Sequence, residues 1–235
     1  MEQNNIIIRV AELTDTHYAI RITDEMESSA KARGTGIAKR SPEYIAQKML
    51  EGKAVIALTT TGQWVGFCYI ETWSHGEYVA NSGLIVSPEF RKSGVAKGIK
   101  KRIFDLSREL YPNAKIFGLT TGLAVMKISS ELGYEPVTYS ELTQDEAFWA
   151  GCKSCVNYDI LMSKGRKNCM CTAMLYDPKD HYTPEETTKE FEKRSKVYER
   201  LLRLKQLFIK DKNGNKKMAS SGPRPKSLLQ YFFNL

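Results

Sequence analysis

Residues 84–110, with the sequence LIVSPEFRKSGVAKGIKKRIFDLSREL, limit the fold more than any other stretch of this chain. Residues 84–86 predict a strand, and the Ser-Pro pair that follows ends it because proline has no amide hydrogen for a sheet ladder. From Val95 to Leu110, apolar residues recur at steps of three and four, which predicts an amphipathic helix. Between strand and helix lies a basic loop that contains Gly94. This arrangement is typical of a phosphate site, since the first N–H groups of a helix are unpaired and carry partial positive charge.

The loop sequence RKSGVA resembles the pyrophosphate loop of the GNAT N-acetyltransferases, which follows the pattern [R/Q]-x-x-G-x-[G/A]. On this resemblance, Arg91, Gly94 and Ala96 match the loop that holds acetyl-CoA. The full candidate set for the co-substrate is Val86, Arg91, Lys92, Ser93, Gly94, Val95 and Ala96. The alternative is an ordinary basic loop before a helix.

The order of the predicted elements also resembles the GNAT order over about residues 6–176. Strands are predicted at 6–10, 54–58, 64–73, 78–86 and 115–120, with strand entry at 133–137, and helices at 12–33, 42–51, 95–110 and 123–132. The resemblance implies an α/β (mixed α+β) fold with a central twisted mixed sheet flanked by helices. We assign residues 1–182 to a GNAT acyltransferase domain and residues 183–235 to a basic, helical C-terminal extension.

The resemblance implies direct acyl transfer from the thioester of acyl-CoA to an amine, which needs a base for the ammonium and often an acid for the thiolate. Many GNAT enzymes carry a tyrosine four residues before the glycine that closes the later helix. That position is Ser129 here, four residues before Gly133, so Ser129 and Tyr134 are the candidate acids. A thiolate also leaves readily without an acid. Glu71 is the candidate base, and its alternative is a solvated residue near the turn that follows.

Residues 32–40, with the sequence ARGTGIAKR, contain three cations, Arg33, Lys39 and Arg40. In the GNAT family the corresponding loop lines the acceptor site, so these cations favour an acceptor that carries carboxylates. Together with the segments ARGTGIAKRSPEYI and CMCTAMLYDP, the chain resembles a bacterial subgroup of N-acetylglutamate synthase-like proteins associated with arginine biosynthesis. That resemblance implies glutamate as the acceptor. The alternatives are a solvated basic loop and a protein amine as acceptor, although three cations disfavour lysine-rich targets.

Four of the five cysteines, Cys152, Cys155, Cys169 and Cys171, fall within twenty residues in the pattern C-x2-C-x13-C-x-C. Two closely spaced pairs resemble the ligand spacing of a structural zinc site with four thiolates. If residues 169–175 form a strand, the second pair shares one face of it. A redox-active thiol pair and buried free cysteines are the alternatives.

Charge divides the chain unevenly. The net charge is +8, but residues 184–235 hold 13 Lys and Arg against 6 Asp and Glu, which leaves a nearly neutral body. In the extension, residues 183–209 predict a helix that docks on the body or on another copy, and residues 211–226 predict a flexible segment. Residues 226–233 resemble sliding-clamp-binding peptides, with an apolar end that packs back on the fold as the alternative.

The composition also limits localisation and partners. No run of 18 apolar residues and no secretory signal is visible, so we expect a soluble cytoplasmic protein that does not bind membranes and that acts on a small-molecule amine. The alternative is a zinc-containing module that binds a protein partner or nucleic acid through an acyl-CoA-binding fold. Nucleic acid is disfavoured because the basic residues lie outside the body and lack interleaved aromatic residues for base stacking.

Overall fold

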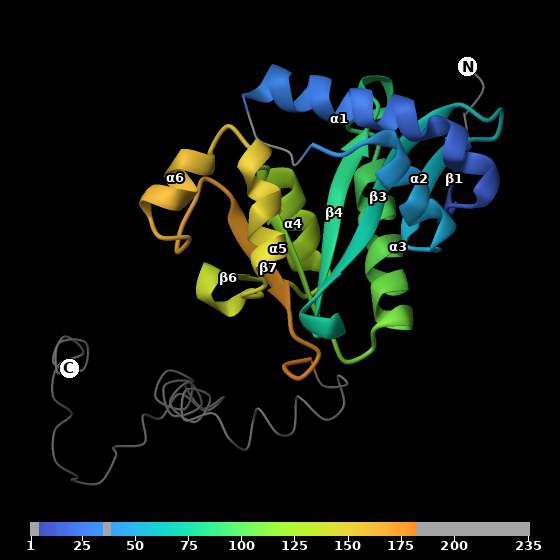
Figure 1. The fold of residues 1–235 in the computed structure, drawn as a ribbon. Helices are drawn as coiled ribbons and strands as arrows, with labels where there is room; N and C mark the ends of the chain where they lie inside the picture. The colour runs from blue at the N-terminus through green and yellow to red at the C-terminus, as the bar shows by residue number, and fades with distance from the viewer. Residues whose placement is uncertain (1–4, 35–38, 182–235) are drawn as a thin grey trace, which may run out of the picture. The chain divides into compact units, whose positions relative to one another are not determined.

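The computed structural model describes residues 5–34 and 39–181 (Figure 1). The strands are β1 Ile6–Val10, β2 Ala54–Thr59, β3 Trp64–Trp73, β4 Tyr78–Val86, β5 Lys115–Thr120, β6 Glu135–Val137 and β7 Thr172–Tyr176. The helices are α1 Ala19–Arg33, α2 Pro42–Leu50, α3 Val95–Leu110, α4 Leu123–Glu131, α5 Glu146–Ala150 and α6 Tyr158–Ser163. The predicted C-terminal helix and the clamp-like peptide lie outside the described residues.

The strands form one seven-stranded sheet in the order β1-β2-β3-β4-β5-β7-β6. All neighbouring pairs are antiparallel except β4 and β5, which are parallel. The sheet is therefore mixed, as the sequence predicts. In the part of the chain that the structure describes, no helix is both long and apolar enough to cross a bilayer.

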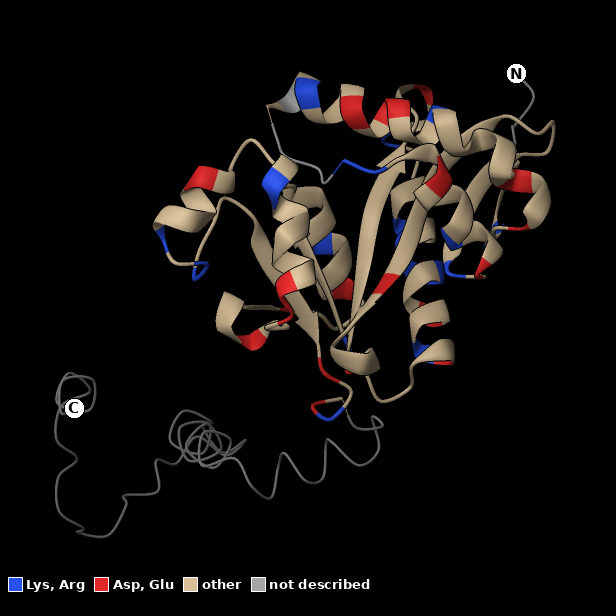
Figure 2. Ribbon diagram, in the orientation of Figure 1, with Lys and Arg blue, Asp and Glu red and all other residues tan. Residues whose placement is uncertain are grey.

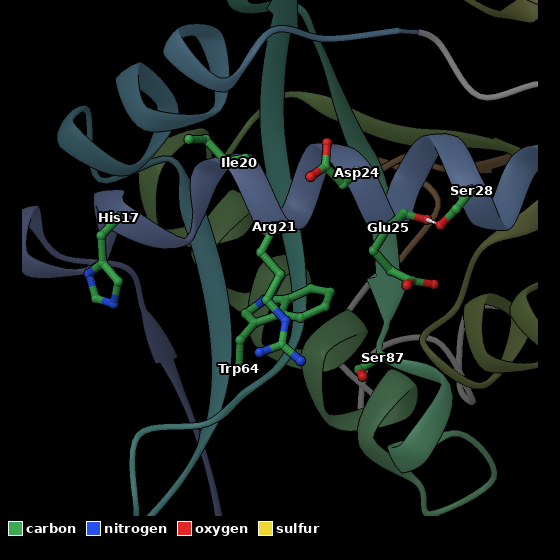
Figure 3. Close-up of a pocket in the computed structure, with 8 residues that line it drawn as sticks. All are labelled: His17, Ile20, Arg21, Asp24, Glu25, Ser28, Trp64 and Ser87. Atoms are coloured by element: carbon green, nitrogen blue, oxygen red, sulfur yellow. Dashed lines mark hydrogen bonds between the residues drawn. The ribbon is translucent and has the colours of Figure 1, made fainter.

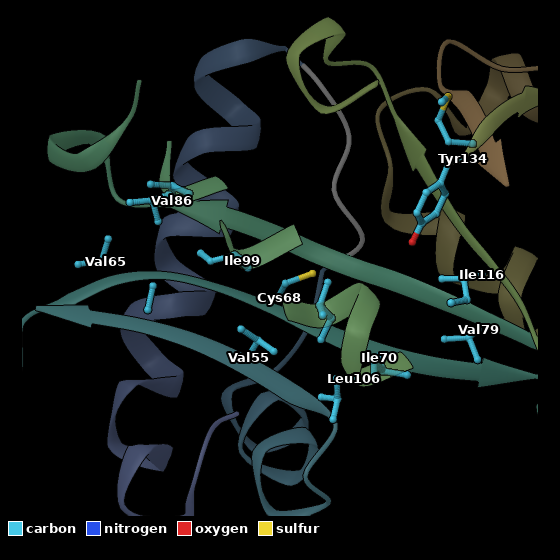
Figure 4. Packing of buried hydrophobic residues seen from close by; sticks show 14 of the residues in the cluster. Val55, Val65, Cys68, Ile70, Val79, Val86, Ile99, Leu106, Ile116 and Tyr134 are labelled. Atoms are coloured by element: carbon cyan, nitrogen blue, oxygen red, sulfur yellow. The ribbon is translucent and has the colours of Figure 1, made fainter. Parts of the chain in front are cut away.

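Two apolar layers cover the central strands. On one face, Ile99 and Ile103 of α3 pack against alternate residues of β2, β3 and β4, among them Cys68 and Ile70 (Figure 4). On the other face, α1 and α2 cover strand residues such as Phe67. Charged residues lie mainly on the helices and connecting segments, while the central strands are largely free of them (Figure 2). A charged side chain within these layers is consequently an exception that needs a local explanation.

Strands β4 and β5 pair over a short distance and then separate. Tyr78–Ala80 pairs with Lys115–Phe117, and no further β4–β5 pairing occurs among the described residues. Beyond this point β4 stays paired with β3, while β5 stays paired with β7. The facing edges of β4 and β5 are thus left without sheet partners at the end of the sheet where β4 leads into the glycine loop. This gap is where an extended ligand can reach the interior.

A bulge in β4 accompanies the separation. The register between β3 and β4 shifts opposite Cys68, where Gly83 has a φ of +66°. A Cβ atom on Gly83 would lie 2.4 Å from Cε1 of Tyr69 and 2.8 Å from the end of Met26. The backbone conformation and the close contact both require glycine.

We expect the Gly83→Ala substitution to lower the free energy of unfolding by roughly 3 kcal/mol, since it adds left-handed backbone strain to an overpacked contact. Gly76→Ala is the matched control, because Gly76 also has a positive φ but has open space around a Cβ. Its expected loss is about 1–2 kcal/mol. Urea titration of both variants measures the two free energies of unfolding. Equal losses would show that the Tyr69 side chain moves away from the added Cβ without a loss of stability.

Two sequence predictions about local structure are wrong. The predicted helix over residues 12–33 is divided into a 3-10 turn at Leu13–Tyr18 followed by α1. The Asp15 carboxylate accepts hydrogen bonds from the Arg9 guanidinium at 2.6 and 3.0 Å and from the Glu12 amide at 2.7 Å, which favours a turn. Residues 169–171 precede β7 rather than belonging to it, so the argument that Cys169 and Cys171 share a strand face fails.

Candidate active site

The predicted phosphate loop lies where expected, between β4 and α3. Gly94 caps α3 with a φ of +85°, and a Cβ there would have open space, so backbone conformation alone selects glycine. Lys92 and Ser93 are exposed, and Val95 begins the buried face of the helix. The first amide groups of this 16-residue helix therefore face an accessible loop.

Arg91 holds this loop against the rest of the fold. Its guanidinium donates to the carbonyl oxygen of Val86 at 3.1 Å, to Oε1 of Glu25 at 2.8 Å and to Oγ of Ser29 at 2.6 Å. These contacts connect the end of β4 to α1. Arg91 thus shapes the loop in addition to adding positive charge near it.

Glu71 is buried in β3, with 5% of its surface exposed, so the interpretation as a solvated residue near the turn is wrong. Its side chain points to the face covered by α1 and α2, as do those of Phe67 and Tyr69. Oε1 accepts hydrogen bonds from Tyr44 at 2.5 Å and from Arg40 at 3.1 Å, and Oε2 accepts one from Ser82 at 2.8 Å. A carboxylate can accept about four hydrogen bonds, so one position remains for a ligand.

Two neutral tyrosines complete this cluster: the Tyr44 hydroxyl donates to Glu71, and the Tyr69 hydroxyl accepts from Arg40. Burial and the hydrogen bond to Glu71 raise the pKa of Tyr44 above its ordinary value. Burial and the nearby Glu71 charge raise the pKa of Tyr69. Both hydroxyl groups therefore keep their protons at neutral pH. The cluster presents one carboxylate and one guanidinium next to Ser82, the second β4 residue beyond the paired segment.

The three predicted acceptor-binding cations differ in their surroundings. Arg40 is mostly buried and donates to Glu71, to the Tyr69 hydroxyl at 3.1 Å and to the Lys39 carbonyl at 3.2 Å. Lys39 is exposed and lies 3.4 Å from Glu27. The side chain of Arg33 lies outside the described part of the structure. A guanidinium has five N–H donors, so Arg40 retains two after these contacts.

The two candidate acids lie on the α3 face of the sheet and are both buried. The Ser129 carbonyl accepts backbone hydrogen bonds from Leu132 and Tyr134 at the end of α4. The Tyr134 hydroxyl donates to Oδ1 of Asn81 at 2.8 Å, and burial raises the pKa of Tyr134 well above its ordinary value. Figure 4 shows the Tyr134 hydroxyl pointing into the apolar layer beside the sheet. Its proton is already engaged by Asn81.

Sequence reasoning missed three polar residues at the strand gap: Asn81, Ser82 and Lys100. Asn81 and Ser82 are the first two residues of β4 beyond its pairing with β5. Lys100 lies on the buried face of α3 and donates to Oδ1 of Asn81 at 3.2 Å. A lysine that directly follows the core residue Ile99 in an amphipathic helix was the signal available in the sequence.

The four-cysteine segment does not form a metal site in the structure. Within residues 5–34 and 39–181, no three side chains of His, Cys, Asp or Glu lie close enough together to hold a metal ion. Burial, followed by the neighbouring cysteines, raises the pKa of Cys152 to about 11 and that of Cys171 to about 12. The Sγ of Cys155 accepts a hydrogen bond from the amide of Asn157. The zinc prediction is not supported, and these residues are free, half-buried thiols.

An open groove of about 480 Å³ runs along α1 and reaches Ser87, directly after β4 (Figure 3). Arg21 stacks over the indole of Trp64 there, with 5.6 Å between the guanidinium carbon and the ring centre. Asp24 and Glu25 line the same groove. Because its walls mix both signs of charge and lack the buried polar cluster, we place the chemistry at the strand gap and not in this groove.

The seven-stranded mixed sheet, the separation of β4 from β5 and the glycine loop at the start of α3 together define the GNAT N-acetyltransferase fold, which confirms the fold predicted from the sequence. The chain is similar to N-acetylglutamate synthase from Neisseria gonorrhoeae, solved with coenzyme A and N-acetyl-glutamate, at a TM-score of 0.52 and 19% identity. That match covers 77% of this chain and 36% of the Neisseria chain, so this chain spans about a third of that protein.

Two shorter proteins match along nearly their whole length. Rv2747 from Mycobacterium tuberculosis, solved with CoA, matches at a TM-score of 0.52 and 17% identity over 73% of this chain and 98% of that one. The protein yncA from Salmonella typhimurium, solved with acetyl-CoA, matches at a TM-score of 0.51 and 15% identity. That match covers 77% of this chain and 98% of the yncA chain. No family model and no curated protein matches the chain. At these identities the likeness establishes the fold alone.

Proposed function

We propose that this protein is an acyl-CoA-dependent N-acyltransferase that moves an acetyl group to the amine of a small anionic acceptor. The observation that carries the proposal is the position of the Glu71 cluster beside the β4–β5 gap, at whose other end lies the glycine loop. A pyrophosphate held at the start of α3 directs an attached arm into this gap. The solved neighbours with CoA or acetyl-CoA support the same co-substrate.

We assign different roles to the two ends of the gap. The backbone of residues 91–96, with Val86 at the end of β4, holds the pyrophosphate. From Val86 back to Asn81 the strand spans roughly 17 Å, so an extended arm of that length brings its thioester to the inner end of the gap. There the unpaired N–H groups of β4 are donors for the thioester carbonyl oxygen, where negative charge develops.

Glu71 serves as the base in this proposal. Its free accepting position faces an acceptor amine that approaches from the α1–α2 side, and it takes the proton that the amine loses on attack. Ser82, Tyr44 and Arg40 fix the carboxylate in place. Both carboxylate oxygens are held, so the geometry of the base does not depend on the bound acceptor.

We propose glutamate as the acceptor, in arginine biosynthesis. The two unused N–H groups of Arg40 and the ammonium of Lys39 offer positive charge for two carboxylates, and Arg33 is the last residue of α1, before the segment that leads to them. The N-acetyl-glutamate bound by the Neisseria enzyme is consistent with this assignment. A cationic acceptor such as lysine would place like charges against Arg40.

We expect glutamate to be the best acceptor, aspartate a poorer one and glutamine poorer still, with lysine and polyamines inactive. Release of free CoA thiol from acetyl-CoA, measured as initial rates across that panel, tests the order. A Lys39→Ala variant should raise the Michaelis constant for glutamate by severalfold and leave that for acetyl-CoA unchanged. A preference for neutral or cationic amines would contradict the assignment of glutamate as the acceptor. If no amine leads to release of CoA thiol, the proposed transferase activity itself is wrong.

A further inference from the structure

Lys100 is a buried cation at the point where β4 and β5 separate. Only 3% of its surface is exposed. Its Nζ atom lies 3.2 Å from Oδ1 of Asn81, the first β4 residue beyond the pairing, and 3.9 Å from the position that a Cβ would take on Gly118. Gly118 is the first β5 residue beyond the pairing. The ammonium therefore lies close to both strands at the inner end of the gap, on the face of the sheet that α3 covers.

The Lys100 ammonium has few hydrogen-bond partners among the described residues. Within the described residues Lys100 forms no salt bridge, and its one hydrogen bond is to Asn81. Its Nζ also lies 4.6 Å from the centre of the Tyr134 ring, a cation–π contact. An ammonium has three N–H donors, so two remain for a ligand. By contrast, the single hydroxyl proton of Tyr134 is already donated to Asn81.

Lys100 and Glu71 lie on opposite faces of the sheet at nearly the same level. Glu71 is paired across β3 and β4 with Ala80, and Ile70 with Asn81, the partner of Lys100. Successive side chains of a strand point to opposite faces, so a thioester carbonyl placed in the gap has Glu71 on one side and Lys100 on the other. An amine that attacks from the Glu71 side displaces the sulfur towards Lys100.

We propose that Lys100 protonates the CoA sulfur as it leaves. This inference rests on the proposed acyltransferase function. The acceptor ammonium first loses one proton to solvent, and the neutral amine attacks the thioester carbon and forms the C–N bond. Glu71 takes the second proton, which the nitrogen releases after attack. The C–S bond then breaks with its electron pair on sulfur, and the Lys100 ammonium donates a proton to give the free thiol. Lys100 then takes up a proton from solvent, and Glu71 releases its proton to solvent.

The surroundings of Lys100 suit this transfer. Burial lowers the pKa of Lys100 to about 8, close to the value of about 8.5 for an ordinary thiol. The titratable groups that face it are Cys68 of β3 and Tyr134 after α4. Burial raises the pKa of Cys68 to about 12 and that of Tyr134 well above 10, so both stay neutral while Lys100 titrates. An acid must hold its proton, so the rate should fall as pH rises through about 8.

The test compares Lys100→Met and Lys100→Arg with the wild-type protein, using acetyl-CoA and the best acceptor from the panel. We expect Lys100→Met to lower kcat by about 10²-fold, at the low end for a general acid because a thiolate leaves readily. Its acetyl-CoA Kd should stay within about twofold. The fall in kcat above pH 8 should disappear in Lys100→Met. In Lys100→Arg it should also be absent between pH 7 and 10, since a guanidinium does not titrate there.

Two controls separate a chemical role from a structural one. Lys100→Met removes a buried charge, and Asn81 still accepts a hydrogen bond from the Tyr134 hydroxyl. The melting temperature of the Lys100→Met variant should therefore not fall. Tyr134→Phe, which also removes one hydrogen bond to Asn81, should keep the fall in kcat above pH 8. An unchanged kcat and pH profile in Lys100→Met would overturn the proposal. So would a loss of activity that comes with weaker acetyl-CoA binding while the pH profile is kept. Failure of the transferase itself is seen separately, as a wild-type protein that releases no thiol.

Discussion

Glu71→Gln is expected to lower kcat by about 10²–10⁴-fold while acetyl-CoA binding is unchanged, because the amide keeps the shape of the side chain but cannot take the proton that the amine loses on attack. The glutamine carbonyl oxygen can still accept a hydrogen bond from Tyr44, and its amide nitrogen can donate to the Ser82 hydroxyl oxygen, so the cluster retains most of its contacts. Stopped-flow or steady-state release of CoA thiol at saturating acceptor measures kcat, and equilibrium titration with acetyl-CoA measures Kd.

Tyr44→Phe is the matched control for this substitution. It removes one hydrogen bond to the same carboxylate and leaves the base in place. We expect a loss of kcat below about tenfold, in line with about 1 kcal/mol for a hydrogen bond. If Glu71→Gln and Tyr44→Phe lower kcat equally, Glu71 is a structural partner of Arg40 and another group or solvent removes the proton.

Arg40→Ala is expected to lower the free energy of unfolding by about 3–5 kcal/mol, because it leaves the Glu71 carboxylate buried without its counter-charge. The pair is joined at 3.1 Å, with 18% and 6% of the two side chains exposed, so solvent screens it little. The substitution also removes the hydrogen bond to Tyr69. Denaturant titration monitored by circular dichroism gives the loss.

A double-mutant cycle isolates the ionic part of that loss. In Arg40→Met with Glu71→Gln, both charges are absent and no buried ion remains. We expect the double variant to be more stable than Arg40→Met alone, with a coupling energy of about 1–3 kcal/mol. Lys39→Ala, on the exposed neighbour, should change stability by less than about 0.5 kcal/mol. Additive losses in the cycle would mean that the two side chains do not stabilise one another.

The secondary structure around the candidate site was predicted well where it follows from local sequence. The strand, Ser-Pro stop, Gly94 loop and helix of residues 84–110 lie as expected, because each depends on hydrogen bonds and periodicity within a few residues. The ends of α2 and β5 agree for the same reason. The N-terminal helix was predicted too long because Arg9 and the Glu12 amide both donate to Asp15 and favour a turn, a contact that periodicity does not reveal.

The sequence by itself determined the mixed α/β fold, the loop that caps α3 and the candidate roles of Glu71 and Arg40. Only the tertiary structure decided that Glu71 is buried against Arg40, that Lys100 reaches Asn81 in the gap, and that no three of the four cysteines lie close enough together to hold a metal ion. The physical reason is that the contacts of Glu71 with Arg40 and of Lys100 with Asn81 join residues 19 or more positions apart. Sheet pairing and helix packing set such distances, and the spacing of residues along the chain does not.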